Sequence, residues 1–129
     1  MKAKLQERLE CIVAELSKNK KVIAIYLFGS QATGKAREDS DIDVAVIMKN
    51  ASEEDGWEIS GFGNDNFDVH PFQRLPLEIQ FRVITEGKVL FVRDKDFFRK
   101  IWISTIRNYL DFKPFIQRFY RSVIENVRY

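Results

Sequence analysis

Several residue types that carry familiar functions are scarce in this sequence of 129 residues. The single cysteine, Cys11, excludes an internal disulfide, and with His70 as the only histidine no Cys/His cluster exists to hold zinc. No apolar run reaches the roughly 18 residues that span a membrane, and the N-terminal segment soon turns polar, without a signal-peptide core. These absences favour a cytoplasmic protein that binds no membrane. We expect Cys11, on a predicted helix, to be a small core residue rather than a nucleophile.

Charge of one sign is also scarce. The formal net charge is +2, so the chain as a whole does not attract nucleic acid, and no direct nucleic-acid binding is expected. The charge is unevenly spread, because the part from Arg93 onward carries +5 and the part before it −3. Such a basic segment can meet an acidic protein or RNA, although it is often only a solvated surface. The length and a 45% hydrophobic composition predict one globular domain over residues 1–129.

The spacing of apolar residues predicts alternating helices and strands. In chain order we expect a helix at 2–18, strands at 22–28 and 42–48 with a short helical stretch between them, a helix at 53–60 capped by Ser52, a strand at 66–72, a helix from Pro76 to 86, an edge strand at 88–93, a helix from Asp94 to 108 and a helix from Pro114 to 127. This order indicates an α/β (α+β) fold class.

The segment between the first two predicted strands carries the strongest chemical signal. Gly29-Ser30 ends the first strand, ten residues follow, and Asp41-Ile42-Asp43 begins the second. Side chains alternate along a strand, so Asp41 and Asp43 point the same way. Paired carboxylates suit Mg²⁺ carrying a nucleoside triphosphate, and Gly29 and Ser30 offer close donors to phosphate. Two such ions can activate an attacking oxygen and neutralise a leaving pyrophosphate.

A third carboxylate is expected on the strand predicted at 66–72. Nucleotidyl transfer needs a base for the attacking hydroxyl, and a carboxylate beside the first two can serve. Asp68 is preferred because apolar neighbours on both sides place it on a strand, whereas its competitor Asp65 lies in a turn-like run. His70 shares the predicted face of Asp68. We interpret it as a structural hydrogen bonder in preference to a catalytic group.

These motifs resemble the signature of the DNA polymerase β-like nucleotidyltransferase superfamily. Within it the chain most resembles the minimal nucleotidyltransferase (MNT) antitoxins of HEPN/MNT toxin–antitoxin pairs. The resemblance covers nearly the whole chain and implies the superfamily's core, a small mixed sheet flanked by helices, with additional C-terminal helices. It also implies that Asp41, Asp43 and Asp68 complete a catalytic, metal-binding triad.

The resemblance bears on the phosphate contacts as well. Arg37 matches a basic position of the family motif and would contact the triphosphate, unless it is only a surface residue. Ser40 either touches the phosphate or, the safer interpretation, caps the loop. The family often has further basic residues where this chain has Gln31 and Thr33, so the resemblance extends to the metal site but not to every phosphate contact.

A partner and a reaction are implied too. Relatives of this kind transfer AMP from ATP, with Mg²⁺, to a tyrosine of a HEPN RNase toxin. The toxin's own signature, an Arg shortly before a His on a helix, is absent, since no Arg lies within six residues before His70. The chain therefore resembles the antitoxin. Other possibilities stay open, namely a module that masks a toxin by binding alone, and nucleotidyl transfer to a small molecule or to RNA.

About half of the aromatic residues lie between Phe97 and Tyr129. The last predicted helix carries one apolar stripe of Phe115, Phe119 and Val123 and a second of Ile116, Tyr120, Ile124 and Val127. Together the stripes are wide for a helix that also has a solvent face. We therefore favour a partner surface over a wide core face.

Overall fold

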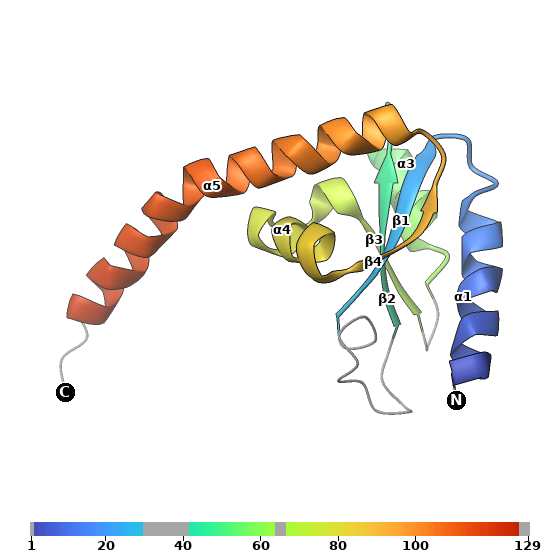
Figure 1. Cartoon of the computed structure of the whole chain (residues 1–129), viewed down its shortest axis with the longest axis horizontal. Coiled ribbons are helices and arrows are strands. Elements are labelled where there is room, and N and C mark those ends of the chain that lie inside the picture. The colour runs from blue at the N-terminus through green and yellow to red at the C-terminus, as the bar shows by residue number, and fades with distance from the viewer. Residues whose placement is uncertain (1, 30–41, 64–66, 127–129) are drawn as a thin grey trace.

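The computed structural model describes residues 2–29, 42–63 and 67–126, and it is drawn in Figure 1. Its elements in chain order are α1 (Lys2–Leu16), β1 (Val22–Phe28), β2 (Ile42–Met48), α3 (Glu53–Ser60), β3 (Phe67–Pro71), the short helix η1 (Phe72–Arg74), α4 (Leu77–Glu86), β4 (Lys88–Val92) and α5 (Lys95–Asn126). No helix among these residues combines the length and the apolarity needed to cross a membrane.

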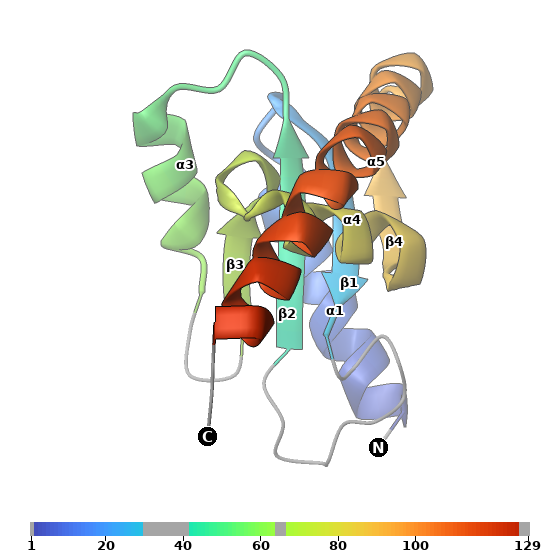
Figure 2. The same cartoon turned by 90° about the vertical axis from the view of Figure 1, so that its left-hand side faces the viewer.

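The four strands form one mixed sheet in the order β3-β2-β1-β4. β1 pairs antiparallel with β2 and with β4, whereas β2 and β3 are parallel. A parallel pair needs a crossover connection, and α3 lies in that connection (Figure 2). The mixed sheet flanked by helices confirms the expected fold class, and β4 is an edge strand as predicted.

Helices cover both faces of the sheet and divide the core in two. On one face α1 and α3 pack Leu16 and Ile59 against Val44 of β2 and its neighbours. On the other face α4 and the first half of α5 cover Ala45 and Ile47. β1 and β2 are therefore buried on both sides, which explains why all their residues except Asp43 are apolar. The alternation along β2 assigns position 43 to the face that α4 and α5 cover.

Side-chain caps set two of the helix starts, as the sequence predicted. The Ser52 hydroxyl accepts a hydrogen bond from the Asp55 N–H at 3.2 Å, and the Asp55 carboxylate accepts one from the Ser52 N–H at 2.8 Å. Lys21 donates to the same carboxylate at 2.7 Å. This Lys21 hydrogen bond, followed by the Ser52 N–H, lowers the pKa of Asp55 to about 2. At the start of α5, Asp94 accepts from the Phe97 N–H at 3.0 Å.

Two expectations are wrong. α5 is one helix of 32 residues with Pro114 inside it, not two helices. A proline in a helix removes its own N–H bond, which here leaves the carbonyl of Leu110 without that donor, and Leu110 is exposed, so water can take its place. Cys11 is exposed rather than part of the core, because it lies on the side of α1 opposite Leu9 and Leu16.

Candidate active site

Three side chains with ligand atoms converge on the two parallel strands. Asp43 of β2 is in register with Asp68 of β3, and Ala45 is in register with His70. Neighbouring residues of paired strands share a face, so Asp43, Asp68 and His70 project to the same side of the sheet. Their ligand atoms all lie within 4.8 Å of one another. The structure thus brings together the two carboxylates that sequence reasoning placed in one site, and their catalytic role stays a prediction.

Gly29 fits against Asp43 in a way that no other residue can. Its φ of 76° is in the left-handed region that side chains disfavour. A Cβ atom at this position would lie 2.7 Å from Asp43 Oδ2, well inside van der Waals contact. The end of β1 can therefore approach the carboxylate only because residue 29 has no side chain. The contact with Asp43 therefore requires glycine at position 29, in addition to the close approach of phosphate that the sequence suggested.

His70 is closer to the carboxylates than sequence reasoning required. Its Nε2 lies 3.5 Å from Asp43 Oδ1, and its ring meets Phe28 edge-on at 5.6 Å between centroids. The distance is long for a full hydrogen bond. Alternation with Asp68 along the strand predicts that His70 shares this face, and its role as a structural hydrogen bonder stays a prediction.

Five residues named as site candidates from the sequence lie outside the described part of the chain. They are Ser30, Arg37, Ser40, Asp41 and the competitor Asp65, and the short helical stretch expected after Gly29-Ser30 lies there as well. Their roles stay predictions. Of the predicted triad, the structure describes Asp43 and Asp68.

The donor set suits a hard divalent cation. Carboxylate oxygens are the ligands that Mg²⁺ prefers, together with phosphate oxygens and water, so Asp43 and Asp68 could hold the ion. Imidazole is a less typical ligand for Mg²⁺, and the position of His70 beside Asp43 suits a group that orients a ligand. Among the described residues, Asp68 is exposed on an edge strand, and Asp43 and His70 are partly exposed.

Comparison with known proteins assigns the chain to a family. Residues 10–96, which include Gly29, Asp43, Asp68 and His70, match the model of the polymerase beta nucleotidyltransferase family. The chain belongs to this family. It is accordingly an enzyme of the nucleotidyltransferase class, and its sheet with the carboxylates at the β2–β3 edge is the family core. The match ends at Asp96, so almost all of α5 lies beyond it.

Similar proteins with names or structures agree with the family. A curated protein of Methanocaldococcus jannaschii, provisionally named a protein adenylyltransferase, is 33% identical over 88 residues, which are 64% of this chain and 70% of the relative. A chain from a toxin–antitoxin complex with AMP-PNP superimposes with a TM-score of 0.72 at 24% identity, over 89% of this chain and 98% of that one. A chain from the complex of a tri-AMPylated Shewanella oneidensis HEPN toxin with its MNT antitoxin has a TM-score of 0.70 at 24% identity, over 92% and 98%. At these identities the superpositions show a common fold.

Proposed function

We propose that this nucleotidyltransferase is an antitoxin that transfers AMP from Mg²⁺-bound ATP to a tyrosine hydroxyl of a HEPN-family RNase toxin and thereby silences it. The observation that carries the proposal is the pairing of Asp43 and Asp68 on adjacent parallel strands, beside the glycine that ends β1. Two carboxylates within 4.8 Å of each other repel when both are ionised, and a shared cation relieves that repulsion.

The reaction is an in-line displacement at the α-phosphorus of ATP. The tyrosine oxygen forms a bond to this phosphorus, the bond to the oxygen bridging the α- and β-phosphates breaks, and pyrophosphate leaves. The tyrosine proton passes to a carboxylate, for which we assign Asp68 because it is the more exposed of the two described aspartates. Asp43 keeps its position through Gly29 and His70. When bound, Mg²⁺ neutralises the charge on the phosphates.

The choice of a protein acceptor rests on two kinds of support. The Methanocaldococcus relative carries the name of a protein adenylyltransferase, and one structural neighbour comes from a complex with an AMPylated HEPN toxin. The carboxylate cluster also lies at an open sheet edge, where a large acceptor can approach. AMP on a tyrosine near the toxin's RNA site would add bulk and negative charge, which repel a phosphate backbone.

The proposal is tested by intact-mass spectrometry of a purified HEPN-family toxin after incubation with this protein, ATP and Mg²⁺. We expect a mass gain equal to one or more AMP groups, located on tyrosine. Changing Asp43→Asn with Asp68→Asn should lower the rate more than about 100-fold, since even one lost electrostatic group in a catalytic site typically costs this much. The matched control removes two exposed carboxylates elsewhere, Glu58→Gln with Glu78→Gln, and should keep full activity.

Two outcomes would refute the proposal. A HEPN protein that loses its RNase activity on mixing but gains no mass would show inhibition by binding alone. Unchanged transfer by the Asp43→Asn, Asp68→Asn variant would remove these carboxylates from the mechanism. Circular dichroism of that variant checks that it is folded, as expected after removal of two like charges from an apo site.

A further inference from the structure

The C-terminal half of α5 projects beyond the rest of the protein as an exposed apolar helix. We call residues 110–126 the distal arm. Every residue in it except Ile116 is exposed, with 66% of Phe119 and 70% of Ile124 accessible. Figure 1 shows the arm extending past α4 and changing direction toward the C-terminus. The wide core face considered from the sequence is therefore wrong for these residues.

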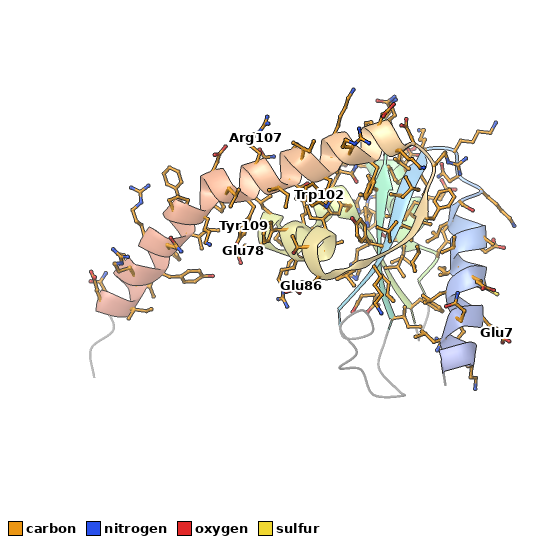
Figure 3. The ribbon with its side chains drawn as sticks, viewed as in Figure 1. Glu7, Glu78, Glu86, Trp102, Arg107 and Tyr109 are labelled. Atoms are coloured by element: carbon orange, nitrogen blue, oxygen red, sulfur yellow. The ribbon has the colours of Figure 1, made fainter. Side chains whose placement is uncertain are left out.

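The apolar face of the distal arm continues the face by which α5 packs on its own domain. In the first half of α5, Thr105 is buried and the Tyr109 ring stacks on Phe81 of α4 at 3.9 Å. Figure 3 shows Tyr109 directed toward α4 and Arg107 directed away from it.

The apolar face starts at Thr105 and advances in alternating steps of four and three residues, through Tyr109, Phe112, Ile116, Phe119 and Val123. We call these six residues the seam. This spacing fits the side of another helix, and α4 covers only the beginning of the seam.

The distal arm and the carboxylates lie on the same side of the sheet. Asp43 alternates with Ala45 and Ile47, which α4 and α5 cover, and Asp68 is in register with Asp43. Figure 2, seen from that side, shows the red end of α5 crossing in front of β2 and β3. A molecule held by the inner face of the arm would therefore stand over the catalytic face of the sheet.

Charge and size define what can bind there. The distal arm has three cations, Lys113, Arg118 and Arg121, against two acids, Asp111 and Glu125, and the Arg118 guanidinium stacks over the Phe115 ring at 4.7 Å.

The face is about 25 Å long and about 10 Å wide. This is far below the roughly 800 Å² per partner of a stable complex. A stable partner must therefore also contact the body of the domain.

The geometry points to the distal arm as the docking surface for the protein acceptor, which presents an apolar helix flanked by acidic residues. This inference rests on the proposed function, because it names the surface by which that function's partner binds. Docking on the arm holds the acceptor hydroxyl near the site and makes its reaction effectively intramolecular. The family match ends before the arm, so the arm can be altered without touching the residues assigned to chemistry.

The test compares two arm variants with the same change in charge. Phe119→Asp with Val123→Asp disrupts the seam, whereas Gln117→Asp with Ser122→Asp places both acids off the seam on the same helix. Binding to the same purified HEPN-family toxin is measured by isothermal titration calorimetry, and binding of Mg²⁺ with AMP-PNP is measured on each variant alone. We expect the seam variant to bind the HEPN protein at least about 100-fold more weakly, since two central apolar residues are lost. The control should bind like the unaltered protein, and AMP-PNP binding should be equal in all three.

The outcomes separate this inference from the proposed function. Equal HEPN binding and equal AMP transfer by both variants would overturn the docking surface and leave the proposed function standing. No HEPN binding or transfer by the unaltered protein would overturn both. A dimer of the unaltered protein in analytical ultracentrifugation that only the seam variant converts to monomer would show that a second copy of this chain occupies the arm, and would also overturn the inference. RNA binding lost only in the seam variant would do the same.

Discussion

Replacing Gly29 with alanine tests whether the close approach of β1 to Asp43 matters for catalysis. The new Cβ would lie 2.7 Å from Asp43 Oδ2, whereas ordinary contact begins at 3.4 Å, so the two groups must separate by about 0.7 Å. The φ of 76° adds a backbone cost, roughly 1–2 kcal/mol for a residue with a side chain. A displacement approaching 1 Å at a catalytic group can cost about 100-fold in rate.

We expect Gly29→Ala to lower the rate of AMP transfer by one to two orders of magnitude, roughly the range that such displacements produce. The free energy of unfolding should fall by only about 1–2 kcal/mol, so the protein stays folded. The rate is measured with the HEPN acceptor at saturating ATP, and stability is measured by urea unfolding. Gly61→Ala is the control, because Gly61 has an ordinary helical φ of −67° and lies at the end of α3.

Two results would refute this reasoning. Full activity in Gly29→Ala would show that Asp43 does not need the position seen here. A loss of activity in Gly61→Ala equal to that in Gly29→Ala would mean that replacing a glycine lowers the rate in general rather than through Asp43.

Four further predictions concern stability and metal dependence. The pKa of Asp55 is lowered to about 2 from 3.8, so its contribution to folding stability is present above pH 4 and is lost as pH falls toward 2. Asp55→Asn should therefore lower the melting temperature at pH 7, and the difference from the unaltered protein should shrink between pH 4 and pH 2. Burial raises the pKa of Tyr26 to about 12 from 10.0, so the unfolded state ionises first and stability falls between pH 10 and 12; Tyr26→Phe should remove that part of the alkaline loss in urea titrations. Pro114→Ala restores one helix hydrogen bond in α5 and should raise the helical signal in far-UV circular dichroism. Chelation with EDTA should stop AMP transfer, and excess Mg²⁺ should restore it.

The fold was largely predictable because local signals agree along most of the chain. The apolar runs of β1 and β2 are buried on both faces, and Ser52 and Asp94 cap helices where the sequence indicated. Pro114 misled because a proline normally ends a helix, yet in an exposed stretch its missing bond costs less than a break would. The prediction that Cys11 is a core residue was wrong because a position on an amphipathic helix does not by itself show which face the residue occupies. Its position relative to Leu9 and Leu16 does.

The sequence predicts which residues form the site, but it does not predict which contacts these residues make with one another. Strand alternation and the family resemblance pointed to Asp43 and Asp68, whose proximity the structure shows. The register that aligns them depends on β2 and β3 pairing in parallel around α3, and such non-local pairing leaves no local pattern. The position of His70 beside Asp43 and the contact of Gly29 with Asp43 follow from that arrangement. Neither could be read from spacing alone.

Positional labelling of ATP tests the central claim most directly. The HEPN protein is incubated with this enzyme, Mg²⁺ and ATP labelled either at the α-phosphate or at the γ-phosphate, and the label on the protein is then counted. Attack at the α-phosphorus predicts that α-label enters the HEPN protein and is absent when Asp43→Asn with Asp68→Asn is used, while γ-label leaves entirely with pyrophosphate. Transfer of γ-label, or α-label that persists in the double variant, would contradict nucleotidyl transfer by this carboxylate pair.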